Sequence, residues 1–152
     1  MALDIVLMND DGFDAPGIQA LYSALVAAGN DVHIVAPKTS ESAQERSLGG
    51  TAALDNPVTI TEFSPGNYNV DGRPDVATRA AIDTLLAGNP PDLIISGTNK
   101  GHNTGESATL AAAAEAVFNY GNPSISLNVG TDTSGMFPSS STMPRARCPC
   151  RN

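Results

Sequence analysis

The chain has 152 residues, a mass of 15.6 kDa, 41% hydrophobic residues, no Trp and a formal net charge of −8. That length is typical of one domain with a real hydrophobic core. The acidic charge disfavours a general binder of the nucleic-acid backbone, and no stretch approaches the roughly 18 apolar residues of a membrane span. The N-terminus lacks the pattern of a secretion signal, so we expect a soluble, cytoplasmic protein.

The N-terminal part of the sequence predicts a strand, a helix and a second strand. Ile5–Met8 is a continuous apolar run of the kind found in strands that are covered on both faces. A helix is expected to follow, with Asp14 as its N-cap, Pro16 in its first turn and an end at residues 29–30. Residues 32–36 predict the second strand, closed by Pro37, which completes a unit of the right length for a parallel crossover.

The same alternation continues along the chain. Further strands are predicted at residues 58–62, 68–70, 93–96 and 124–127, and a helix at residues 75–87. A last helix begins near Ser107 and places five apolar residues on one face: Leu110, Ala111, Ala114, Val117 and Phe118. Alternating strands and helices predict a three-layer α/β/α fold with a mostly parallel, Rossmann-like sheet. We expect this domain to span residues 1–128, and residues 129–152, which lack periodicity, to form a disordered tail.

Two adjacent carboxylates, Asp10 and Asp11, follow the first predicted strand directly. Near a buried strand end, both stay ionised comfortably only if a cation or several hydrogen-bond donors lie between them. A hard divalent cation such as Mg²⁺ or Mn²⁺, which prefers oxygen ligands, is the simplest solution. An Asp-Gly turn in which both acids face water is the alternative, and these residues alone do not decide between the two.

Three loops leave predicted strands at the edge where open parallel sheets bind their ligands, and each is rich in small oxygen-bearing residues. The third loop is rich in glycine and precedes a helix. Glycine backbone N–H groups can approach an anion closely, and a helix N-terminus adds partial positive charge. Besides the two aspartates, the candidate ligand-binding residues in these loops and at that helix start are Asn9, Ser42, Gly97, Asn99, Asn103, Ser107 and Thr109.

The order of these motifs resembles the SurE family, the stationary-phase survival proteins with metal-dependent 5′/3′-nucleotidase activity. The matching segments are Asn9-Asp-Asp-Gly-Phe-Asp-Ala-Pro-Gly-Ile-Gln19, Val35-Ala36-Pro37, Asp71-Gly72-Arg73-Pro74 and Ser96 to Gly105. The resemblance covers about residues 3 to 128, and the first and last segments together are quite specific.

The resemblance implies a phosphomonoesterase that hydrolyses nucleoside 5′/3′-monophosphates by metal-assisted in-line attack of water, with Mg²⁺ or Mn²⁺ as cofactor. It implies neither a nucleic-acid polymer nor a membrane as a partner, and a homo-oligomer that is weakened if the family's C-terminal arm is missing. The implied metal ligands are Asp10, Asp11, Ser42 and Asn99, of which Asp10, Asp11 and Asn99 are also catalytic, with one aspartate orienting the water. The implied substrate contacts are Asn9, Ser42, Gly97, Asn103, Ser107 and Thr109.

The sequence also departs from the family pattern. Only Glu106 stands between Gly105 and Ser107, where the family carries several more residues, and Ala108 replaces a glycine. Family members continue well past this length, so we expect a chain truncated or altered at its C-terminal end. Two other interpretations stay open: a SurE-like fold left inactive by the missing part, and a receiver-like, Mg²⁺-binding signalling domain with Asp71 as phosphoacceptor.

Five further residues carry less weight. His33 lies in a predicted strand and is expected to be structural, whereas His102 and Lys100 fit a solvated loop better than a site. Cys148 and Cys150 have no accompanying histidine, so they do not suffice for a zinc site, which needs about four ligands.

Overall fold

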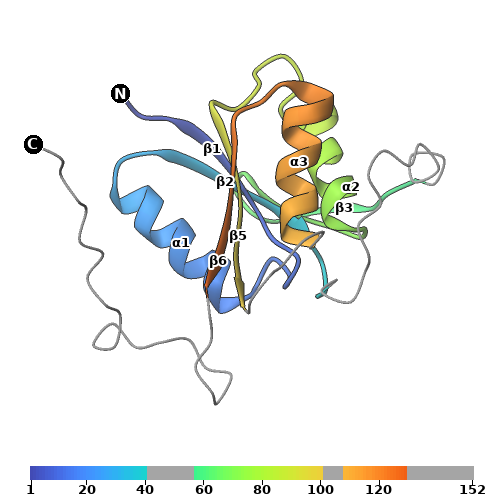
Figure 1. Ribbon diagram of the computed structural model, residues 1–152, viewed down its shortest axis with the longest axis horizontal. Helices are drawn as coiled ribbons and strands as arrows, with labels where there is room; N and C mark the ends of the chain where they lie inside the picture. The colour runs from blue at the N-terminus through green and yellow to red at the C-terminus, as the bar shows by residue number, and fades with distance from the viewer. Residues whose placement is uncertain (41–56, 101–107, 130–152) are drawn as a thin grey trace, which may run out of the picture.

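The computed structural model describes residues 1–40, 57–100 and 108–129 (Figure 1). In these ranges one sheet has the strand order β3-β4-β2-β1-β5-β6. All neighbouring strands pair in parallel except β3, which is antiparallel to β4. The strands are β1 (Asp4–Met8), β2 (Asp31–Pro37), β3 (Ile60–Ser64), β4 (Asn67–Val70), β5 (Leu93–Lys100) and β6 (Ser124–Val129). The mostly parallel α/β sheet predicted from the sequence is confirmed.

Helices cover both faces of the sheet and give three layers (Figure 1). One face carries α1 (Pro16–Ala27), and the other carries α2 (Pro74–Arg79), its π-helical continuation η2 (Ala80–Leu85) and α3 (Ala108–Tyr120). Successive side chains of a strand point to opposite faces. Ile5 and Leu7 of β1 therefore pack in the cluster under α1, and Val6 and Met8 pack in the cluster under α2 and α3. Burial on both faces explains why β1 is a continuous apolar run.

Two local predictions about the helices need correction. The N-cap of α1 is Ala15, without a side-chain cap hydrogen bond, so the prediction of Asp14 as N-cap is wrong. Pro16 opens the helix and has no N–H that would need a cap. The helix predicted at residues 75–87 is present, but beyond Arg79 it becomes π-helical, and the N–H of Leu86 bonds to the carbonyl five residues back.

Three of the five apolar residues predicted to share one face of α3 do not lie on its buried side. Leu110, Val117 and Phe118 are exposed, Phe118 by 76%. Small residues and one acid form the buried side instead: Ala112, Ala113, Glu115 and Ala116. Alanines let the helix lie close to the sheet, and the buried Glu115 is paired with the guanidinium of Arg79 on α2. Among the helices in the described ranges, none combines the length and apolarity needed to cross a bilayer.

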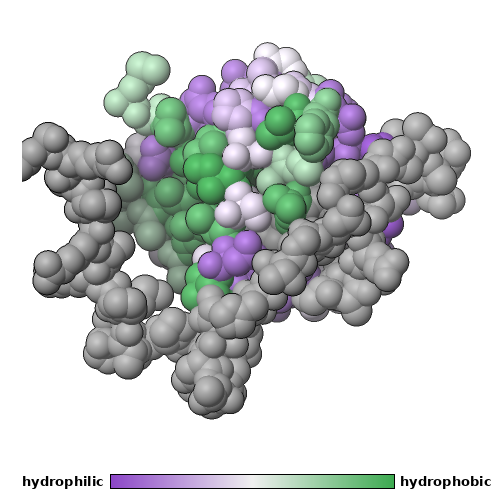
Figure 2. Space-filling view, in the orientation of Figure 1, coloured by the Kyte–Doolittle hydropathy of each residue, from purple (hydrophilic) through white to green (hydrophobic). Residues whose placement is uncertain are grey.

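The edge strand β6 and the outward side of α3 carry exposed apolar side chains. Ile125 of β6 is exposed, as are the three large apolar residues of α3, and β6 contains no charged residue. Figure 2 shows hydrophobic residues gathered over this part of the molecule.

The order of the strands creates a switch point at β1. The chain passes from β1 through α1 to β2 on one side, and from β4 through α2 and η2 to β5 on the other side of β1. Open α/β sheets bind ligands outside the carboxyl ends of the strands at such a point. In this fold that place lies beyond Met8 of β1 and Ser96 of β5, which pair in register.

Candidate functional site

The turn after β1 is held closed by the side chain of Asn9. This wholly buried amide donates from Nδ2 to the carbonyl oxygen of Gly12 at 2.9 Å, and its Oδ1 accepts the N–H of Gly12 at 3.2 Å. The N–H of Ala15 also donates to the Gly12 carbonyl, at 3.1 Å. The Asn9 side chain therefore shapes the loop that presents the two aspartates, and its contact with substrate stays a prediction.

The two aspartates in this turn are not both exposed to water. Asp10 is only 3% exposed, and Asp11 is half-buried. The alternative interpretation of an Asp-Gly turn with both acids in solvent is therefore wrong. A carboxylate in a buried setting needs compensating charge or hydrogen bonds to remain ionised.

The second part of the site comes from β5, which is longer than predicted. Residues 93–96 were expected to form the strand, but it continues to Lys100, so Gly97 and Asn99 lie in a strand and not in a loop. Pairing with β6 resumes after a register shift, with Asn99 opposite Asn128. Asn99 is 4% exposed. Gly97 has a φ of +139°, and a Cβ there would collide with the carbonyl oxygen of Leu127, so only glycine fits.

The fold thus places Asp10 and Asp11 at the end of one strand and Asn99 at the end of its neighbour. Thr109 lies in the first turn of α3. The other predicted ligand-binding residues, Ser42, Asn103 and Ser107, and also His102, lie outside the described residues.

The placed residues fit a hard cation. Carboxylate and amide oxygens are the ligands that Mg²⁺ and Mn²⁺ prefer, and Asp10 and Asn99 are both nearly buried, as ligands of an enclosed cation would be. Within the described ranges, no three His, Cys, Asp or Glu side chains are grouped so that they could hold a metal ion. The predicted donor set is of another kind, since it has two carboxylates, one amide and one hydroxyl.

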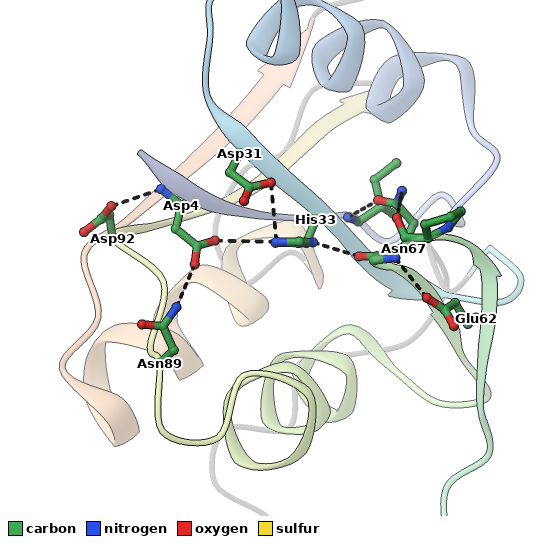
Figure 3. A network of polar contacts seen from close by, with 10 residues as sticks. Asp4, Asp31, His33, Glu62, Asn67, Asn89 and Asp92 are labelled. Atoms are coloured by element: carbon green, nitrogen blue, oxygen red, sulfur yellow. Dashed lines mark hydrogen bonds and ion pairs between the residues drawn. The ribbon is translucent and has the colours of Figure 1, made fainter. Parts of the chain in front are cut away.

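A second polar cluster lies at the other end of the strands, where β1 and β2 begin (Figure 3). His33 Nδ1 lies 2.9 Å from the carbonyl oxygen of Gly66, and its Nε2 lies 3.9 Å from Asp4 Oδ1 and 3.7 Å from Asp31 Oδ1. Asp92 accepts the backbone N–H of Asp4 at 3.0 Å. Burial raises the pKa of the Asp4 carboxyl, Asp31 and Asp92 also raise it, and His33 lowers it. These contacts agree with a structural role for His33.

The contact between Thr98 and Gly17 is not among the features of the site that the sequence predicts. Thr98 Oγ1 donates to the carbonyl oxygen of Gly17 at 3.0 Å, which joins β5 to the first turn of α1. One signal for it is present in the sequence. A glycine inside a helix costs stability relative to alanine, so its presence in a first turn indicates a close approach of another backbone.

The fold and these residues define a class: a Rossmann-like α/β domain with acidic and amide oxygens at the switch point of its parallel sheet. The family model described as "Survival protein SurE" matches residues 5–147. The chain therefore belongs to the SurE family, as its motifs indicated.

Curated relatives and a solved structure support the same assignment. The 5′-nucleotidase SurE of Pelobacter propionicus is 43% identical over 141 residues, which cover 90% of this chain and 54% of that protein. The 5′-nucleotidase SurE of Treponema pallidum is 42% identical over 123 residues, covering 77% and 63% respectively. The crystal structure of the SurE protein from Aquifex aeolicus matches with a TM-score of 0.75 and 34% identity, covering 85% of this chain and 52% of that one. The chain spans about half the length of the curated relatives it matches.

Proposed function

We propose that this domain hydrolyses nucleoside monophosphates with the help of a divalent cation, Mg²⁺ or Mn²⁺, bound where β1 and β5 end. The observation that supports this most is that a nearly buried carboxylate, Asp10, follows β1 and a nearly buried amide, Asn99, lies near the end of the neighbouring strand β5, at the switch point of the sheet. The relatives named 5′-nucleotidase SurE point to the same reaction.

Each residue has a proposed part in the reaction. When bound, the cation supplies positive charge for the phosphoryl transition state and acidifies water. Asp10 and Asp11 provide the negative charge that holds it, and one of them orients the attacking water. Asn99 and Ser42 add neutral oxygen ligands. The proposed donors to the phosphoryl oxygens are Ser107 and Thr109, and Gly97 and Asn103 are further proposed substrate contacts.

The receiver-like interpretation finds less support in the topology. Its phosphoacceptor would be Asp71, which follows β4. Because β2 lies between β4 and β1, Asp71 is two strands away from Asp10. Strands are about 4.8 Å apart, so this offset is about 10 Å, which is too far for a phosphoacceptor that shares a cation with the acidic pair.

Phosphate release from nucleoside monophosphates tests the proposal. We expect the protein to release phosphate with Mn²⁺ and to lose this activity with EDTA. Asp10→Asn removes a proposed charged ligand itself, so its activity should fall by more than the about 10–100-fold typical of changes in residues that only support metal ligands. Asp14→Asn is the matched control, because Asp14 is an exposed acid of the same loop outside the proposed site. Release that is insensitive to EDTA, or full activity in Asp10→Asn, would contradict the proposal. Binding of Mn²⁺ without any release would favour a SurE-like fold that is inactive.

A further inference from the structure

The two parts of the proposed cation site come from strands whose mutual pairing ends before either part is reached. The last paired residues of β1 and β5 are Met8 and Ser96. Beyond this pair, β1 turns into the aspartate loop, and β5 shifts its register against β6 before Asn99. Ladder hydrogen bonds between β1 and β5 therefore do not by themselves set the separation between Asp10 and Asn99.

A second connection between the two parts runs through the first turn of α1. Thr98, the neighbour of Asn99, donates its hydroxyl hydrogen to the carbonyl oxygen of Gly17 at 3.0 Å. A Cβ added to Gly17 would lie 2.6 Å from the Thr98 carbonyl oxygen and 3.1 Å from its Oγ1. The backbones are thus in contact at a distance that only glycine allows.

The segment between the aspartates and Gly17 is held by its own hydrogen bonds. Gly12 is held by the side chain of Asn9 and accepts the N–H of Ala15. Phe13 donates its N–H to the Pro37 carbonyl oxygen at 3.0 Å. Because these hydrogen bonds hold the connecting segment, a displacement of the first turn of α1 would also displace the aspartate loop.

We infer that the contact between Gly17 and Thr98 is a positioning contact that sets the separation of Asp10 and Asp11 from Asn99, and with it the affinity for a divalent cation. The inference rests on the proposed function. With alanine at position 17, reaching an ordinary contact of 3.4 Å from the Thr98 carbonyl oxygen requires a shift of about 0.8 Å. Functional sites need their groups within about 0.5 Å of the productive geometry, and Mg²⁺ in particular demands nearly ideal ligand distances.

Titration calorimetry with Mn²⁺ on the whole chain, with a thermal melt of each variant, tests the inference. Gly17→Ala is expected to raise the dissociation constant about 10-fold or more, in the range seen for residues that orient metal ligands. Thr98→Val, which keeps the shape of the side chain but removes the donor, is expected to raise it about 3-fold or more, and Thr98→Ser is expected to restore it.

Ser124→Ala is the matched control. Ser124 Oγ donates to the Ala113 carbonyl oxygen at 2.8 Å, which is also a bond from a strand hydroxyl to a helix carbonyl. It lies at the start of β6, away from the site. We expect this variant to lose thermal stability as Thr98→Val does, while its dissociation constant for Mn²⁺ stays within about 2-fold.

The outcomes separate this inference from the proposed function. If the unmodified chain does not bind Mn²⁺, the proposed function fails and the inference fails with it. If the unmodified chain binds, and Gly17→Ala and Thr98→Val bind equally well, only the inference is overturned. If Gly17→Ala does not fold, the comparison of Thr98→Val, Thr98→Ser and Ser124→Ala decides the question.

Discussion

An ion pair in the interior joins the two helices on one face of the sheet, and its loss should be costly. Arg79 Nε of α2 donates to Glu115 Oε1 of α3 at 2.7 Å, and the two residues are 9% and 2% exposed. Burial lowers the pKa of the Arg79 guanidinium, but its hydrogen bond to Glu115 and the charge of Glu115 more than offset this, so the pKa of Arg79 is raised. The Arg79 guanidinium is therefore charged at neutral pH.

The magnitude follows from what each substitution leaves behind. Glu115→Leu leaves a buried guanidinium without its carboxylate, and Arg79→Met leaves a buried carboxylate, so each should cost about 3–5 kcal/mol of unfolding free energy. Because a domain of this size is stable by only about 5–15 kcal/mol, each loss is a large fraction of the total. The double variant removes both charges and keeps a similar volume, so we expect it to cost far less than the sum of the two.

Urea denaturation followed by circular dichroism measures the four proteins of this cycle. The control is Arg73→Met. Arg73 pairs with Asp75 at 2.9 Å, and 31% of the Arg73 side chain is exposed, although its partner Asp75 is only 9% exposed. We therefore expect a loss smaller than in either single variant of the Arg79–Glu115 pair, about 1–3 kcal/mol. Losses below about 1 kcal/mol in both single variants of the buried pair, or a double variant as unstable as the sum of the two, would refute this reasoning.

Two further predictions concern the rest of the fold. The raised pKa of Asp4 means that this carboxyl stabilises the fold below its unfolded pKa of 3.8, and that this contribution is lost as the pH rises through the raised folded value. Asp4→Asn should therefore raise the melting temperature at neutral pH but not below about pH 3.5, and calorimetric scans with no gain at neutral pH would contradict this. Asn67→Ala removes the oxygen that accepts the Ile34 N–H at 2.7 Å in the buried β2–β4 region. Urea denaturation should show a loss of about 1–3 kcal/mol in the free energy of unfolding, and no loss would mean that water replaces the amide and would contradict the prediction.

Much of the fold could be predicted because its signals are local. The apolar run of β1, the glycine after α1 and the two short strands predicted at residues 58–62 and 68–70 each depend on a few neighbouring residues, and the structure confirms these elements. The buried face of α3 could not be predicted from apolarity. Its large apolar side chains face outward, whereas Glu115 faces inward because Arg79 lies opposite, and such pairing across helices is not visible in a pattern of single residues.

The candidate site was predicted in part for the same reason. The Asp10–Asp11 pair stands out because two acids follow a buried strand, and the structure places Asp10 in the interior. The extension of β5 beyond Ser96 was missed because glycine usually marks the end of a strand, whereas Gly97 is required here by the proximity of Leu127. The close approach of Thr98 and Gly17 joins residues 81 positions apart, so only the folded chain reveals it.

Diffraction from crystals soaked in Mn²⁺, analysed by anomalous scattering, tests the central claim most directly. We expect an anomalous peak within about 2.2 Å of a carboxylate oxygen of Asp10 and of the side-chain oxygen of Asn99. A peak only at the acidic cluster around His33 and Asp4, or no peak at saturating Mn²⁺, would contradict the claim that the ends of β1 and β5 form a cation site.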